Sequence, residues 1–144
     1  RHALANPKIT SEEFDEAGKL SPENYVIHFL PGQYKDKEKG GTLRLGAYKC
    51  QIKKGTKTYD LYKQTMISER HRHRYEINND FRPKLEKAGM IFSGINPQQN
   101  LVEIAEIKDH PFMLGSQFHP EFKSRPNRPH PLFKGLIAAA KKIK

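Results

Sequence analysis

The chain has 144 residues, of which 35% are hydrophobic, and a formal net charge of +10. That length fits one domain, and no apolar run approaches the roughly 20 residues that cross a bilayer, so we predict no membrane partner. The first residues lack the hydrophobic stretch of a signal peptide, and the single cysteine, Cys50, excludes an internal disulfide. These features predict a protein of a reducing, cytoplasmic compartment.

Strands and helices are mixed along the chain, which predicts an α/β fold. Alternating or continuous apolar runs predict strands at residues 24–30, 42–52, 90–95, 101–107 and 112–118. Helical segments are predicted at residues 60–64, 81–88 and 132–143. Apolar residues recur at helical spacing in the last of these, and we expect them to face the core: Leu132, Phe133, Leu136, Ile137 and Ala140.

Residues 69–76 form the densest polar run, in which arginine and histidine alternate. On an extended segment, Arg70, Arg72 and Arg74 would share one face, with His71 and His73 on the other. Three guanidinium groups suit a carboxylate or phosphate ligand, because each offers a planar pair of donors. The run is also compatible with a solvated basic strand or a nucleic-acid contact.

A zinc site built from His71, His73 and the distant His119 is a further interpretation of the histidines. The adjacent arginines disfavour a divalent cation, and His-x-His spacing is common by chance. We therefore predict no metal site in this chain.

The segment Gln117-Phe118-His119-Pro120-Glu121-Phe122 follows an apolar run that is expected to be a buried strand. Residues two apart on an extended segment point the same way, so His119 and Glu121 can lie side by side. An imidazole held in one tautomer by a carboxylate makes two thirds of a nucleophilic triad. The nucleophile itself is not evident, because Cys50 falls within a predicted strand, where a cysteine is normally a small buried apolar residue.

Several segments, taken in order, resemble the glutaminase domain of the CTP synthase family. They are the runs GGTLRLG at residues 40–46, ERHRHRYE at 69–76, DHPF at 109–112, QFHPEF at 117–122, SRP at 124–126 and PLF at 131–133. The His-Pro-Glu element alone indicates only the broader class I glutamine amidotransferases. The other runs narrow the resemblance, which covers essentially all of residues 1–144 and is looser before residue 40.

The resemblance implies a flavodoxin-like, doubly wound α/β fold and hydrolysis of L-glutamine at a Cys-His-Glu triad. The ammonia would pass to a synthetase domain that uses ATP with Mg²⁺ to convert UTP into CTP, with GTP as an allosteric activator. His119 would be the general base, Glu121 its orienting partner and Arg74 the group that holds the substrate carboxylate. Glu13 would contact the substrate ammonium. The resemblance also implies a homo-oligomer in the full enzyme, no cofactor in this segment and no nucleic-acid partner.

The sequence departs from the family in one respect, because it has no Gly-x-Cys-x-Gly elbow to carry the nucleophile. Residues 1–4 resemble the end of the helix that follows the elbow, so the nucleophile is expected upstream of Arg1. We therefore expect the C-terminal part of a glutaminase domain, lacking the part that bears the nucleophile. The competing hypothesis is a non-catalytic basic or regulatory module that holds a phosphorylated ligand or nucleic acid through Arg70, Arg72 and Arg74.

Overall fold

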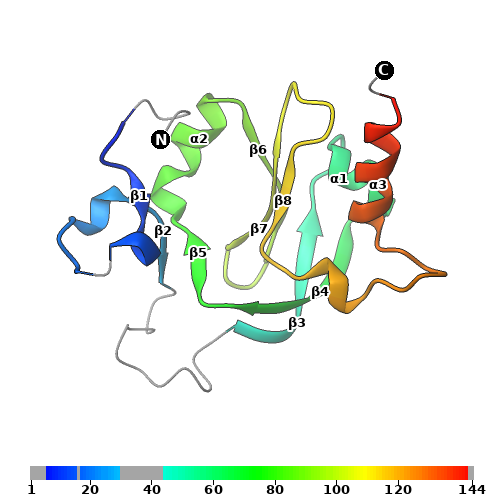
Figure 1. Cartoon of the computed structure of the whole chain (residues 1–144), viewed down its shortest axis with the longest axis horizontal. Helices are drawn as coiled ribbons and strands as arrows, with labels where there is room; N and C mark the ends of the chain where they lie inside the picture. The colour runs from blue at the N-terminus through cyan, green and yellow to red at the C-terminus, as the bar shows by residue number, and fades with distance from the viewer. Residues whose placement is uncertain (1–5, 16, 30–43, 143–144) are drawn as a thin grey trace.

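The computed structural model describes residues 6–15, 17–29 and 44–142, which form two β-sheets flanked by short helices (Figure 1). The smaller sheet has the order β1-β2-β5, formed by Thr10–Ser11, Tyr25–Phe29 and Tyr75–Ile77. The larger sheet has the order β4-β3-β6-β7-β8, formed by Met66–His73, Arg44–Ile52, Met90–Ile95, Val102–Ile107 and Leu114–Ser116.

The mixture of sheets and helices confirms the predicted α/β class. Among the described strands, only β1 and β2 pair in parallel, and the other pairings are antiparallel. The predicted strands at 90–95 and 101–107 are confirmed as β6 and β7. Asn96 shapes the turn between them, since its Oδ1 accepts hydrogen bonds from the backbone of Gln98 and Gln99 at 3.0 and 2.9 Å.

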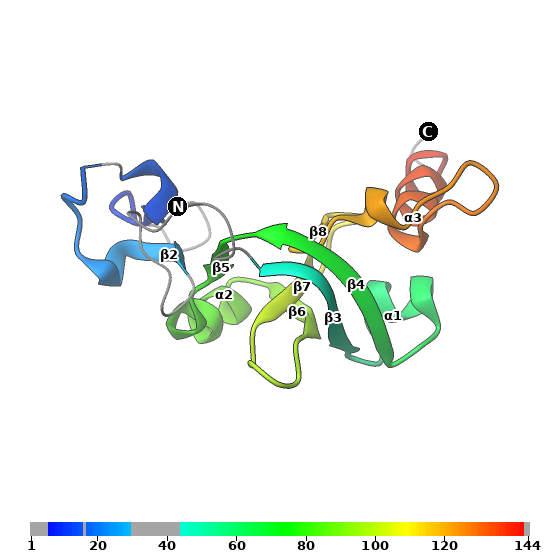
Figure 2. The same cartoon turned by 90° about the horizontal axis from the view of Figure 1, so that it is seen from below.

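The run of alternating arginine and histidine connects the two sheets. β4 lies in the larger sheet and ends at His73, while β5 begins at Tyr75 in the smaller sheet, so Arg74 sits at the crossing. Figure 2 shows β4 as a long curved strand that runs from the neighbourhood of β5 towards α1. The predicted alternation is confirmed within β4, because Arg70 and Arg72 are exposed and His71 is buried. Arg74 lies beyond the strand, so the three arginines do not form one continuous strand face.

Short helices lie on both sides of the larger sheet (Figure 1). The helices are α1 (Lys57–Tyr62), α2 (Arg82–Lys87) and α3 (Pro131–Ala140), with 3₁₀ turns η1 (Glu12–Phe14), η2 (Pro22–Asn24), η3 (Asn79–Phe81) and η4 (Pro120–Phe122). Thr56 caps the N-terminus of α1, since its Oγ1 accepts a hydrogen bond from the backbone N–H of Tyr59. Among the described residues, no helix has the length and apolar character that crossing a bilayer requires.

The predicted core-facing stripe of the last helix is wrong for most of its members. Leu132 is buried, but Phe133, Leu136 and Ile137 are 39%, 49% and 57% exposed. α3 instead packs through a small residue: a Cβ added to Gly135 would come within 2.6 Å of Leu61 on α1. Helical spacing of apolar residues identified an amphipathic helix, but the face that meets the rest of the described chain is set by close approach at the glycine.

Some predicted features fall wholly or partly outside the described residues. These are the helix end at residues 1–4 and positions 40–43 of the glycine-containing run.

Candidate active site

His119 and Glu121 are brought together by a turn that follows the last strand, β8. η4 starts with Pro120, and His119 precedes it in an extended conformation, with its backbone N–H donating to the Arg70 carbonyl at 2.9 Å. The Nδ1 of His119 lies 2.7 Å from Oε1 of Glu121. The hydrogen bond from His119 lowers the pKa of Glu121, which favours an ionised carboxylate facing Nδ1–H. This arrangement leaves Nε2 as the basic nitrogen, and the side-chain proximity predicted from the spacing is confirmed.

Phe122 is a neighbour of His119 that the sequence argument missed. The two rings are stacked, with centroids 5.1 Å apart and planes inclined by 16°. In a 3₁₀ turn, residues three positions apart lie above one another. A turn that starts with the proline after His119 therefore places Phe122 beside the His119 ring. The stack and the carboxylate together restrict rotation of the imidazole.

Arg74 lies on an aromatic support made by the neighbouring sheet. Its guanidinium carbon is 5.5 Å from the ring centroid of Phe29 and 5.2 Å from that of Tyr75. The two rings pack against each other at 4.5 Å, because Phe29 and Tyr75 are paired in β2 and β5. Stacking on aromatic faces leaves the planar edge of a guanidinium able to bind a carboxylate.

Glu13 lies in η1, which is attached to the same sheet. Glu12 accepts a hydrogen bond from the Phe29 backbone at 2.8 Å, and this contact fixes η1 against β2. The pKa of Tyr75 is raised, first by burial and then by the charges of Glu13 and Glu12, while Arg74 opposes the shift. Glu13 and Arg74 therefore both affect the pKa of Tyr75. The structural role of Glu12 was not predicted from the sequence.

A buried network of charged and polar groups lies between the two sheets. Arg44 on β3 donates to Glu76 on β5 at 3.2 Å and to Glu103 on β7. The side chains of all three are 2% exposed or less. His71 and His73 on β4 complete the network, with His71 Nδ1 and His73 Nε2 separated by 2.7 Å. The partners of Arg44 could not be predicted from the sequence, because strand register brings together residues far apart in the chain.

Burial dominates the protonation of this network. It raises the pKa of Glu76 to about 7, with Arg44 opposing the shift and Glu103 adding to it. It lowers the pKa of His71 to about 3 and that of His73 to about 4, with Arg44 and His119 contributing to both. His119 therefore lies near enough to both buried histidines to affect their pKa values.

Replacing Glu76 by glutamine is expected to change the pH dependence of stability. Because the folded pKa lies above the ordinary value of 4.5, burial of Glu76 costs little below about pH 4.5, and the cost grows as pH rises from there to about 7. We expect the unfolding free energy of Glu76→Gln, relative to the parent, to increase by about 2 kcal/mol between about pH 5 and about pH 8. Urea unfolding of the domain at both pH values measures it, and a difference that does not change with pH would contradict the assignment.

Cys50 is unsuited to be the nucleophile. Its side chain is fully buried on β3, and burial raises the pKa of the thiol to about 12. The interpretation of Cys50 as a buried apolar residue is supported by this environment. In the described part of the chain, no cluster of three or more His, Cys, Asp or Glu side chains is arranged to hold a metal ion.

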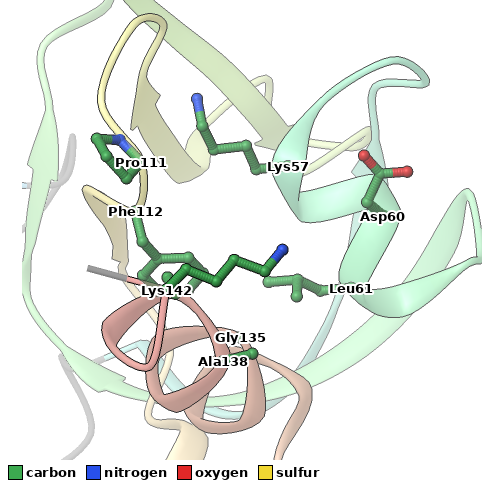
Figure 3. Close-up of a pocket in the computed structure, with 9 residues that line it drawn as sticks. Lys57, Asp60, Leu61, Pro111, Phe112, Gly135, Ala138 and Lys142 are labelled. Carbon is green, nitrogen blue, oxygen red and sulfur yellow. The ribbon is translucent and has the colours of Figure 1, made fainter. Parts of the chain in front are cut away.

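A separate pocket of about 540 Å³ lies between α1, α3 and the segment around Phe112 (Figure 3). Its wall is mainly apolar, with Leu61 and Phe112 facing Gly135, and Lys57 and Lys142 at its edge. The residues lining it include neither His119, Glu121, Arg74 nor Glu13. The predicted site residues therefore do not line this pocket.

Comparison with known proteins places the chain in a family. Residues 17–139 match the family described as glutamine amidotransferase class-I. A CTP synthase of Bacillus subtilis (strain 168) is 56% identical over 140 residues, which are 97% of this chain and 25% of that protein. A CTP synthase of Dehalococcoides mccartyi is 54% identical over 143 residues, which are 99% of this chain and 26% of that protein.

A solved structure of the Trypanosoma brucei CTPS glutaminase domain with bound acivicin has a TM-score of 0.81 and 32% identity. The match covers 98% of this chain and 54% of that one. The chain spans about a quarter of the length of the curated relatives it matches. It belongs to the glutamine amidotransferase class-I family, and its fold is similar to that of a CTP synthase glutaminase domain.

Proposed function

We propose that this chain is the C-terminal part of the glutaminase domain of a CTP synthase. In this role it supplies the base and the substrate-binding groups for hydrolysis of the side-chain amide of L-glutamine. The observation that carries the proposal is the 2.7 Å contact between His119 and Glu121, in a chain whose sequence matches CTP synthases over nearly its whole length. The ammonia would pass to a synthetase domain that uses ATP with Mg²⁺ to convert UTP into CTP.

In the proposed reaction, Nε2 of His119 removes the proton of a cysteine thiol, and the thiolate attacks the amide carbon of glutamine. The imidazolium then returns the proton to the departing nitrogen, which leaves as ammonia, and a thioester remains. His119 next removes a proton from water, which attacks the thioester to release glutamate and regenerate the thiol. Glu121 holds Nδ1–H throughout and stabilises the positive charge on the ring. The thiol would belong to a residue outside this sequence, because the single cysteine of the chain, Cys50, is buried and has a raised pKa.

Arg74 and Glu13 are proposed to hold the two charged groups of the substrate. The guanidinium of Arg74 would bind the α-carboxylate through paired hydrogen bonds, and the carboxylate of Glu13 would face the α-ammonium. The aromatic support beneath Arg74 lowers the freedom of the side chain, so less entropy is lost when the substrate binds. Both charges of the amino acid would then have a partner of opposite charge in this chain.

Replacing Arg74 by glutamine in the full-length enzyme tests this assignment. Loss of a charge-assisted pair of hydrogen bonds is expected to raise KM for glutamine by about 10- to 100-fold, with ammonia-dependent CTP formation close to that of the parent. Arg72→Gln is the matched control, since Arg72 is exposed on β4, and it should behave like the parent. Equal KM values for the parent and Arg74→Gln would exclude Arg74 from substrate binding.

A further inference from the structure

A line of hydrogen bonds runs through the interior from His71 on β4 to the backbone beside Arg74, and Glu103 on β7 lies next to its inner end. Oε2 of Glu103 lies 3.3 Å from Nε2 of His71. Nδ1 of His71 lies 2.7 Å from Nε2 of His73, and Nδ1 of His73 lies 3.0 Å from the Tyr75 carbonyl oxygen. The side chains of Glu103 and His71 are fully buried, and that of His73 is 13% exposed, so water does not readily substitute for these contacts.

The carbonyl at one end determines where each proton lies. A carbonyl oxygen only accepts, so Nδ1 of His73 carries a proton and, in the neutral ring, Nε2 is an acceptor. Nδ1 of His71 must then donate to it, which leaves Nε2 of His71 as an acceptor facing Glu103. That nitrogen and Oε2 of Glu103 make no hydrogen bond in the structure, so the line of hydrogen bonds ends at His71. Burial lowers the pKa of both histidines, in agreement with two neutral rings.

The last bond of the line spans Arg74. It joins the side chain of His73, where β4 ends, to the carbonyl of Tyr75, where β5 begins. His73 is paired with Arg44 in the larger sheet, and Tyr75 is paired with Phe29 in the smaller one. Arg44 also holds Oε1 of Glu103, which keeps the other oxygen of that carboxyl directed at His71. The backbone on both sides of Arg74 is thus fixed to the interior.

We propose that His71 and His73 are positioning residues that hold the backbone around Arg74, and so aim its guanidinium at the substrate carboxylate. This inference rests on the proposed function of Arg74. Neither residue needs to touch the substrate. Their effect is expected in the affinity for glutamine and not in the steps that use ammonia.

Two substitutions of His73 in the full-length enzyme separate the bonds it makes. Asparagine can place an amide N–H near the position of Nδ1 and keep the bond to the Tyr75 carbonyl. Glutamine reaches the position of Nε2 and keeps a partner for His71, but it gives up the bond that spans Arg74. We expect His73→Gln to raise KM for glutamine about ten-fold and His73→Asn to raise it less than about three-fold, because small displacements of a binding group are costly. Ammonia-dependent CTP formation should be retained in both.

Glu103→Gln is the matched control, because Glu103 makes no hydrogen bond to His71 and the amide oxygen of the variant can still accept from Arg44. We expect its KM for glutamine to stay within about three-fold of the parent value. Equal KM values for the two His73 variants, a raised KM for Glu103→Gln, or loss of ammonia-dependent activity in both His73 variants would each overturn the proposal. Arg74→Gln is measured alongside: if it leaves KM unchanged, the assignment of Arg74 fails first.

Discussion

His119→Ala in the full-length enzyme is expected to abolish CTP formation from glutamine while leaving formation from added ammonia near the parent level. Removing the imidazole takes away the base for the thiol and for water, as well as the acid for the leaving nitrogen. General acid–base groups of this kind contribute about 10²- to 10⁴-fold, and this one acts in both halves of the reaction. We therefore expect a loss of at least about 10³-fold with glutamine. Steady-state rates with each nitrogen source provide the measurement.

The control for this experiment is His110→Ala. His110 is exposed and precedes Phe112 in the loop before β8, away from the contact between His119 and Glu121. It should retain activity with both nitrogen sources. Parallel loss of both activities in His119→Ala would mean that the residue supports the fold of the enzyme, and would contradict its assignment as a base.

Arg44→Met is expected to destabilise the domain by about 3–5 kcal/mol, the largest effect on stability that the structure indicates. The substitution retains much of the apolar side-chain length but removes the charge that faces two buried carboxyl groups. Glu76 and Glu103 are each fully buried, so without Arg44 they must either take up protons or remain as uncompensated charges. The destabilisation should be smaller at acid pH, where Glu76 is protonated. Denaturant unfolding followed by the signal of this domain measures the change.

Lys49→Met is the matched control on the same strand. Lys49 is exposed, while Arg44 is buried, so the same product residue is placed on the opposite face of β3. A change within about 0.5 kcal/mol is expected for this control. If Arg44→Met were no more destabilising than Lys49→Met, the network would not depend on the guanidinium, and the account of the pKa shifts around it would be wrong.

Features set by local spacing could be predicted from the sequence. His119 and Glu121 are two residues apart across a proline, so their contact follows from a single turn. The hairpin of β6 and β7 follows from two apolar runs joined by a turn at Asn96. The alternation of β4 likewise separates the exposed Arg70 and Arg72 from the buried His71.

Features set by contacts between distant segments could not be predicted in the same way. The support of Arg74 comes from Phe29, and the partners of Arg44 come from β5 and β7, so each depends on strand register across the molecule. The wrong prediction for α3 has a related cause. Apolar periodicity shows that Phe133 and Ile137 share a face, but it does not show which face meets the rest of the described chain.

The most direct test of the proposed function is an assay of the purified full-length protein with L-glutamine, in which glutamate and ammonia are measured together. The proposal predicts that both products form in equal amounts. Absence of hydrolysis, together with salt-sensitive binding of single-stranded nucleic acid that is lost when Arg70 and Arg72 are replaced, would contradict it. That result would instead favour a basic binding module.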